Sequence, residues 1–189
     1  NVICLILCTL TLVLSASQAL AASALSVLGK DYTFPNRIEG LPARLSDFKG
    51  LEIDSFKTSD NVRLSYWECG KGKPLIFIPG WSANGAEYIN VMYLLSKHYH
   101  VYILDPRNQG LSQKVDYGTR ISRYAMDVKE LSDHLGLNSA DYCGWSMGAA
   151  VLWSYVDLFG TRSIRKVIFI DEPISIYCNH DWSEQERLN

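Results

Sequence analysis

The chain of 189 residues is long enough for one domain with a substantial core, and its composition, 48% hydrophobic and 20% charged, is that of a globular protein. The formal net charge is −2 and Lys and Arg form no run, so we expect no nucleic-acid partner and no anionic membrane surface. No spacing of Cys or His suits a zinc site, and neither a metal nor another cofactor is expected.

Residues 1–21 are interpreted as a secretory signal peptide. Residues 2–14 are almost entirely apolar, and Ala19-Leu20-Ala21 fits the A-x-A pattern of a cleavage site. The apolar run is shorter than the roughly 20 residues that a transmembrane helix needs, which favours a signal peptide over a single-pass anchor. Because the chain begins at Asn1 without Met or a basic segment, we expect the signal to be incomplete. The predicted location is secreted or periplasmic, with no membrane contact after cleavage.

Three cysteines would remain after cleavage: Cys69, Cys143 and Cys178. An odd number permits at most one intrachain disulfide and does not fit a disulfide-framework domain. Whether any two of them pair is left open. Cys143 is expected to be a small buried apolar residue.

Residues 22–50 differ in pattern from the rest of the mature chain. They are weakly periodic and are interrupted by Pro35, Gly40 and Pro42, which predicts an N-terminal arm with little regular structure. Regular patterning begins near Leu51, and residues 51–189 are interpreted as one domain.

This domain opens with two alternating segments, residues 52–57 and 62–69, which predict an antiparallel hairpin turning at Asp60 and Asn61. Continuous apolar runs and helical spacing then alternate along the chain. The predicted strands cover residues 75–78, 101–104, 141–145 and 167–170, and the predicted helices cover about 86–97, 121–135 and the segment after 146. Gly136 is placed to cap the second helix. The alternation predicts an α/β fold with a mostly parallel sheet and the hairpin at one edge.

Residues 144–148, Gly-Trp-Ser-Met-Gly, lie where the predicted third buried strand, at 141–145, meets a helix. A serine flanked by glycines two positions away on each side fits a nucleophile elbow, in which a tight strained turn projects the hydroxyl. The glycines avoid collisions with the neighbouring strand and helix. The N–H of Met147 would lie at the helix N-terminus, where partial positive charge stabilises an oxyanion. An ordinary glycine-rich turn with an unreactive serine is the alternative, and the strand and helix context favours the nucleophile.

Three motifs together resemble the α/β-hydrolase superfamily, most closely its branch of small esterases, perhydrolases and cofactor-free haloperoxidases. They are Pro-Gly-Trp at residues 79–81, Asp-x-Arg-x-x-Gly-x-Ser at 105–112 and the elbow at 144–148, each following a predicted strand. The resemblance extends over residues 51–173. It implies an α/β-hydrolase-type, mostly parallel sheet in which the strand at 75–78 lies between those at 101–104 and 141–145.

The resemblance also implies roles for individual residues. Ser146 matches the nucleophile, and the backbone N–H groups of Met147 and Trp81 match the two oxyanion-hole donors. The family uses a His-Gly pair before the second donor, and this chain has Pro79-Gly80 instead. The donor is a backbone group, so the substitution removes only a side chain that often supports the loop. Trp81 is equally interpreted as a core or rim tryptophan.

Within the second motif, Asp105 and Arg107 match a loop-bracing pair rather than catalytic residues. Asn108 stands where the family usually has glycine. Asn tolerates left-handed dihedrals, so the loop is expected to keep its conformation.

The main departure from the family lies at the C-terminus, since the family places its acid and then its histidine after the nucleophile. Asp171 and Glu172 are possible acids, although a solvent-facing strand end is the interpretation we favour. His180 is a possible base, and the remaining histidines fit poorly: His98, His100 and His134. The chain is therefore expected to be the N-terminal two-thirds of such a domain, incomplete at the C-terminus.

The predicted function is that of a serine hydrolase acting on esters or related small acyl compounds, which needs C-terminal residues absent here. An aspartate nucleophile, as in dehalogenases and epoxide hydrolases, is disfavoured because the elbow carries Ser146. The alternative is a non-catalytic fragment or a degenerate α/β-hydrolase-fold protein that only binds ligands or partners. The pattern does not reveal the substrate or the oligomeric state.

Overall fold

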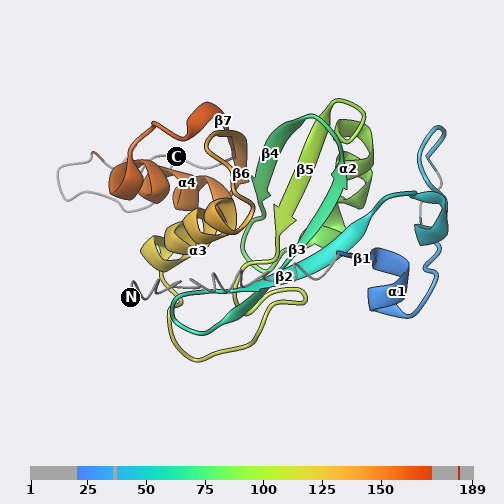
Figure 1. The fold of residues 1–189 in the computed structure, drawn as a ribbon, viewed down its shortest axis with the longest axis horizontal. Helices are drawn as coiled ribbons and strands as arrows, with labels where there is room; N and C mark the ends of the chain where they lie inside the picture. Colours follow the sequence, from blue (N-terminus) through green and yellow to red (C-terminus); the bar gives the residue numbers. More distant parts are fainter. Residues whose placement is uncertain (1–20, 36–37, 172–182, 184–189) are drawn as a thin grey trace, which may run out of the picture.

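The computed structural model describes residues 21–35, 38–171 and 183. Over these residues the chain forms one mixed sheet with helices on both faces (Figure 1). The strands are β1 (Ala22–Ser23), β2 (Glu52–Lys57), β3 (Arg63–Gly70), β4 (Lys73–Ile78), β5 (Tyr99–Leu104), β6 (Ala140–Trp145) and β7 (Ile164–Ile170). The helices are α1 (Ala24–Leu28), α2 (Ile89–Leu95), α3 (Ile121–His134) and α4 (Met147–Phe159), with 3₁₀ turns η1 (Leu45–Asp47) and η2 (Gly85–Tyr88).

The strand order is β1-β2-β3-β5-β4-β6-β7. Strand β4 pairs in parallel with β5 on one side and β6 on the other, and β6 pairs in parallel with β7. Strands β2 and β3 form the antiparallel hairpin, and its turn has Asn61 at φ 67°. The α/β fold, the hairpin at the edge and the central position of β4 are therefore confirmed.

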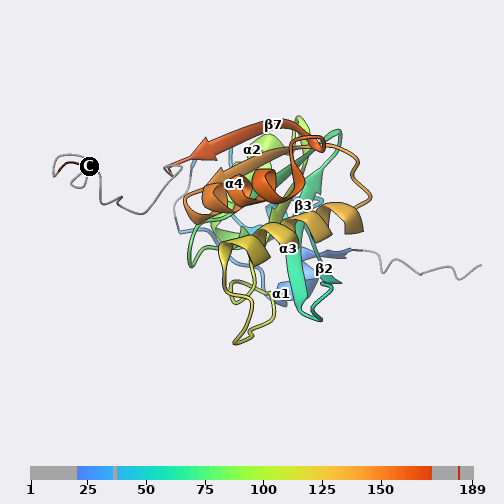
Figure 2. The ribbon, with the colours of Figure 1, turned by 90° about the vertical axis from the view of Figure 1, so that its left-hand side faces the viewer.

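Alternate side chains of the strands point to the two faces, which gives two apolar clusters. One cluster contains Tyr66, Ile76, Tyr102 and Tyr142 and packs under α3 and α4. The other contains Trp67, Phe77, Ile103 and Cys143 and packs under α2 and the N-terminal arm. Figure 2 looks onto α3 and α4, which lie in front of the sheet, with β7 along its upper edge. The parallel strands thus lie between two helical layers, with their carboxyl ends along one edge.

The N-terminal arm at residues 22–50 has more structure than its sequence predicts. Strand β1 extends the sheet beside β2, and α1 follows it with Ser23 as the N-cap. Ala24, Leu45 and Phe48 are buried in the cluster under α2. The arm adds its apolar side chains at isolated positions, which no periodic pattern reveals.

The helix predicted over residues 86–97 is shorter and begins differently. The segment enters as the 3₁₀ turn η2 and becomes α-helical only at Ile89, and the helix ends at Leu95. Asn84 and Glu87 form a capping box at its start. The predicted helix at residues 121–135 is confirmed as α3, and Gly136 follows it at φ 65°.

Two of the three cysteines that follow the predicted signal peptide fall in the described part of the chain. Cys69 and Cys143 are buried, free thiols, and Cys178 lies outside the described residues. Of the helices in residues 21–35 and 38–171, none has the length and apolar character of a membrane span. The predicted signal peptide is described only at Ala21, so secretion stays a prediction.

Candidate active site

The carboxyl end of β6 turns directly into α4 at Ser146. This residue has φ 51° and ψ −121°, which is a costly conformation for a residue with a side chain. Its side chain is half-buried, between the exposed Trp145 and the buried Met147. The strained turn, with strand before and helix after, is the geometry that a nucleophile elbow requires.

The two glycines of the motif are required by close backbone contacts. A Cβ atom at Gly144 would collide with the carbonyl of Gly148, at the first turn of α4. A Cβ atom at Gly148 would collide with the Ile78 carbonyl and lie 2.8 Å from the Pro79 carbonyl oxygen. The elbow is therefore pressed against the end of β4 as well as against its own helix, which fixes its position.

Hydrogen bonds hold the backbone of Ser146 on both sides. Its N–H donates to the carbonyl oxygen of Ile170, the last residue of β7, at 2.8 Å. Its carbonyl oxygen accepts from the N–H groups of Ala149 at 2.8 Å and Ala150 at 3.3 Å. The strained conformation is thus maintained by β7 on one side and by the first turn of α4 on the other.

The chain after β4 forms a tight turn at residues 80–83, beside the serine. The N–H of Ala83 donates to the Gly80 carbonyl at 3.3 Å, and Ser82 has φ 61°. A Cβ atom at Gly80 would lie 3.3 Å from the Cβ of Ser146, so this turn contacts the elbow directly. Trp81, at the second position of the turn, is 74% exposed and is a rim residue, not a core one.

Two backbone N–H groups near the serine are unused by the described part of the chain. The N–H of Trp81 donates to no described residue. The N–H of Met147 is the first of α4, whose start has no side-chain cap. Free N–H groups at a helix N-terminus and in a neighbouring turn are suited to binding a carbonyl oxygen that gains negative charge.

An apolar recess of about 260 Å³ lies beside the elbow. Its walls are Phe77, Tyr88, Val91, Trp145 and Ile170. None of these side chains is charged, so the surroundings of the serine favour a neutral, apolar group. The sequence analysis did not identify this recess, because its residues come from four separate segments.

Cys143 lies three residues before Ser146, and its thiol is poorly suited to act as a nucleophile. Burial raises the pKa of its thiol to about 11, so the thiol stays protonated near neutral pH. This confirms the prediction that Cys143 is a small buried residue.

The loop after β5 carries Asp105 and Arg107, and both are fully buried. They were expected to brace the loop as a pair, but the two side chains bind different partners. Asp105 accepts hydrogen bonds from the loops after β4 and β5. Arg107 forms ion pairs with Asp127 of α3 at 2.7 Å and with Asp60 of the hairpin turn at 3.0 Å. Asn108 has φ 69°, as its sequence position predicts, and its side-chain oxygen accepts from the Val115 N–H at 2.6 Å.

The ion-pair partners of Arg107 were missed by the sequence analysis. Burial acts to lower the pKa of Arg107, but hydrogen bonds to Asp127 and Asp60 raise it above its usual value. The sequence did contain a hint for Asp127. It lies three positions after Tyr124 and four before Leu131, which places an acidic residue in the apolar stripe of α3. A buried acid in such a stripe needs a cationic partner.

The predicted acid and base are only partly placed. Asp171 directly follows Ile170 at the carboxyl end of β7, is exposed, and has φ 56°. Glu172 and His180 lie outside the described residues. Asp171 is therefore one described carboxylate that follows the strand beside the elbow.

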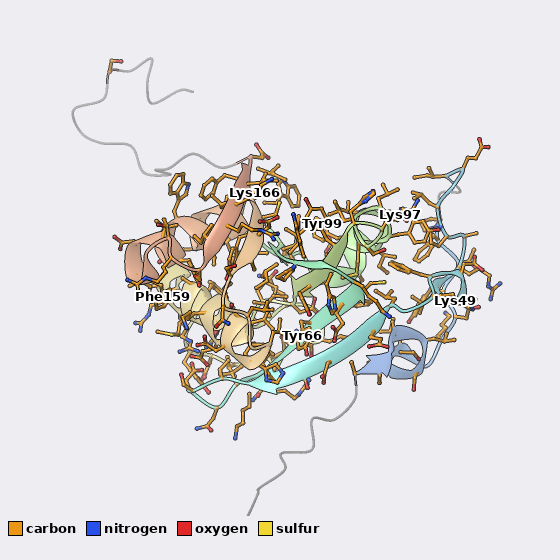
Figure 3. The ribbon with its side chains drawn as sticks, turned by 45° about the horizontal axis from the view of Figure 1, so that its top comes forward. Lys49, Tyr66, Lys97, Tyr99, Phe159 and Lys166 are labelled. Atoms are coloured by element: carbon orange, nitrogen blue, oxygen red, sulfur yellow. The ribbon has the colours of Figure 1, made fainter. Side chains whose placement is uncertain are left out.

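The other histidines lie away from the elbow. His98 and His100 flank Tyr99, which Figure 3 labels at the amino end of β5, the opposite end of the parallel strands. His100 pairs with Glu68 at 2.9 Å, and its other ring nitrogen contacts the Tyr102 hydroxyl at 3.0 Å. His134 ends α3 and stacks on Phe56 of β2. Within the described residues, no histidine follows a strand at the carboxyl edge.

A mixed sheet with a parallel core between helical layers, and a strained serine turn at the carboxyl ends of its parallel strands, define an α/β protein with an elbow of the hydrolase type. The comparisons with known proteins agree. Residues 73–188 match the family model described as alpha/beta hydrolase fold, and the chain belongs to that family.

Among its relatives, a non-heme haloperoxidase of Rhodococcus erythropolis is 29% identical over 59% of this chain and 41% of its own length. A soluble epoxide hydrolase of Corynebacterium sp. is 31% identical over 61% of this chain and 40% of its own length. The solved structure of an esterase from Rhodococcus sp. is similar with a TM-score of 0.62 and 25% identity, over 66% of this chain and 47% of that one. The chain thus spans less than half the length of the proteins it resembles.

Proposed function

We propose that Ser146 is the nucleophile of a serine hydrolase that acts on esters or related acyl compounds. The observation that carries this proposal is the strained backbone of Ser146 at φ 51° and ψ −121°, in contact with a turn that offers a second free N–H group. A conformation this costly persists only where the surrounding structure maintains it, and such strain is concentrated at functional sites.

In the proposed reaction the Ser146 oxygen attacks the acyl carbon while its proton passes to a general base. The carbonyl π electrons move to oxygen, and the resulting oxyanion is stabilised by the N–H groups of Met147 and Trp81. Collapse of the tetrahedral intermediate expels the protonated leaving group and leaves an acyl-enzyme. Water then attacks the acyl-enzyme by the same steps, releases the acid and restores the serine.

The general base of the proposed reaction is a histidine outside the described residues, because His98, His100 and His134 lie away from the carboxyl edge. His180 remains one candidate. Asp171 is the described candidate for the acid that orients the base. The acyl group is proposed to be small and uncharged, since the recess beside the elbow is lined by apolar side chains.

Covalent labelling tests the nucleophile directly. We expect a fluorophosphonate probe to add to Ser146, seen as a mass increase on a single peptide that contains residues 144–148. Ser146→Ala should abolish labelling, whereas Ser26→Ala, at an exposed site on α1, should leave it unchanged. Labelling should be slow and become faster when free imidazole is added, because no histidine of the described residues lies at the elbow and imidazole can act as the general base.

Two results would contradict the proposal. Labelling that persists in Ser146→Ala would place the nucleophile elsewhere. No labelling of Ser146 at high probe and imidazole concentrations, in a folded sample, would favour a non-catalytic binding protein. A slow parent rate that falls further in His180→Ala would identify His180 as the base.

A further inference from the structure

The carboxylate of Asp105 is the centre of this inference. It lies at the end of β5 with no exposed surface. One of its oxygens accepts from the N–H of Gly85 at 2.7 Å, and the other accepts from the N–H of Leu111 at 2.7 Å. No Lys or Arg in the described part of the chain forms an ion pair with it. Backbone groups from two different loops therefore hold a buried carboxyl group.

The carboxylate and the Gly85 backbone that it contacts are both closely packed. A Cβ atom at Gly110 would collide with the Asp105 carboxylate, and a Cβ atom at Gly85 would collide with the indole of Trp67. Burial raises the pKa of Asp105, and the hydrogen bonds from Gly85 and Leu111 act in the opposite direction. The two N–H groups thus offset part of the cost of burying the charge.

The bond to Gly85 fixes one end of the turn that contacts Ser146. Gly85 begins η2, and the turn at residues 80–83 lies only one residue before it, separated by Asn84. Asn84 itself is held by the capping box with Glu87. The other end of the turn follows β4 with only Pro79 between them. Asp105, which follows β5, therefore anchors residues 80–85, and this segment includes the backbone N–H of Trp81.

We propose that Asp105 is a positioning residue of the reaction: its carboxylate fixes residues 80–85 so that the Trp81 N–H faces the oxygen bound at Ser146. This inference rests on the proposed function, and Asp105 itself touches no reacting atom. Complete loss of one oxyanion-hole donor lowers the rate about 10²–10³-fold, and a misplaced donor should lower it by less. Loosening the segment should therefore slow the chemistry more than it weakens reversible binding.

The variant Asp105→Asn tests the proposal because the amide oxygen can accept from only one of the two N–H groups. The amide NH₂ would face the other N–H, and two donors repel each other. The matched control is Asp127→Asn, a buried carboxylate that contacts Arg107 and not residues 80–85. Three quantities are measured for each variant: the melting temperature, the maximal rate constant for fluorophosphonate labelling, and the probe concentration at half-maximal rate.

We expect Asp105→Asn to lower the maximal labelling rate at least about tenfold while the half-maximal concentration changes less than about threefold. Asp127→Asn should lower the melting temperature but keep the maximal rate within about threefold of the parent. Equal rate losses in the two variants, or no loss in Asp105→Asn, would overturn the proposal.

Amide hydrogen exchange separates failure of this proposal from failure of the proposed function. In the unmodified chain the Gly85 and Leu111 amides should be protected, and in Asp105→Asn the amides of residues 82–85 should exchange faster while those of α3 do not. Unprotected Gly85 or Leu111 amides in the unmodified chain would overturn the role of Asp105 even if Ser146 is labelled. If Asp105→Asn does not fold, this measurement on the unmodified chain decides the question. Protected amides without labelling would instead contradict the nucleophile, and with it the catalytic role given to Asp105.

Discussion

Two regions of the molecule are stabilised by different kinds of interaction. At the elbow, Ser146 and its flanking glycines are fixed by backbone hydrogen bonds and close backbone contacts, without charged groups. Behind the hairpin turn, Arg107 and Arg123 bind a group of carboxylates through their side chains: Asp60, Asp127 and Glu130. The comparison teaches that the elbow depends on the space available to each residue, whereas the ion-pair network depends on charge and on pH.

The largest effect is expected where space is most limited. Gly148→Val places a branched side chain against the Ile78 carbonyl, and neither strand nor helix can move without breaking the sheet. We expect a loss of more than about 5 kcal/mol in the free energy of unfolding, above the usual overpacking cost of about 1–3 kcal/mol, because the clash is with backbone atoms. Urea unfolding followed by circular dichroism measures it.

The control is Asp157→Val, which adds the same branched side chain to an exposed position of α4. It should cost less than about 1 kcal/mol, as helix propensity predicts. Similar losses of unfolding free energy in the two variants would show that the close contact at Gly148 leaves room for a larger side chain.

The second effect concerns the centre of the ion-pair network. Arg107→Met leaves the buried Asp127 and the partly buried Asp60 without their main partner. Breaking a buried ion pair on one side costs about 3–5 kcal/mol, because a charge remains uncompensated. Arg123→Met should cost less, about 1–2 kcal/mol, because Arg107 still holds Asp127. Chemical denaturation of both variants tests the order, and a larger loss at Arg123 would reverse the assignment of the centre.

The smallest effect is the response of the network to acid. Burial acts to raise the pKa of Asp60, but hydrogen bonds from Arg107 and Thr58 outweigh it and lower the pKa to about 2. Because the folded value lies below the ordinary value of 3.8, the carboxylate stabilises the fold above about pH 4, and this stabilisation is lost as the pH falls toward 2. The difference in unfolding free energy between the parent and Asp60→Asn should therefore shrink from pH 6 to pH 2. A difference that stays constant would show that Asp60 is not paired in solution.

The comparison also explains how much the sequence could predict. The elbow was predictable because its requirements are local: Gly144 and Gly148 report close backbone contacts, and the flanking apolar residues report a strand and a helix. The position of β4 between β5 and β6 followed from the resemblance to the α/β-hydrolase superfamily. The left-handed conformation of Asn108 followed from its replacement of a glycine.

The network was not predictable, because its partners are far apart in sequence. Arg107 contacts Asp60 across 47 positions and Asp127 across 20. The start of η2 was missed for a similar reason, because Gly85 packs against Trp67 of β3, which is remote in sequence. Where a site depends on contacts between remote segments, a single sequence carries at most a hint, such as the acid in the apolar stripe of α3.

The hydrogen bond from Ser146 to Ile170 links the serine to the outermost strand of the described sheet. Strand β7 carries Ile168 and Ile170, 57% and 40% exposed, on the face away from α4. An outer strand with little covering surface is among the first parts of a sheet to open in local fluctuations. Each opening of β7 would release the backbone of Ser146 from its strained conformation. If Ser146 is the proposed nucleophile, the fraction of time in which it keeps its strained conformation depends on the local opening equilibrium of β7, and covering this strand would raise its reactivity without adding any group to the site.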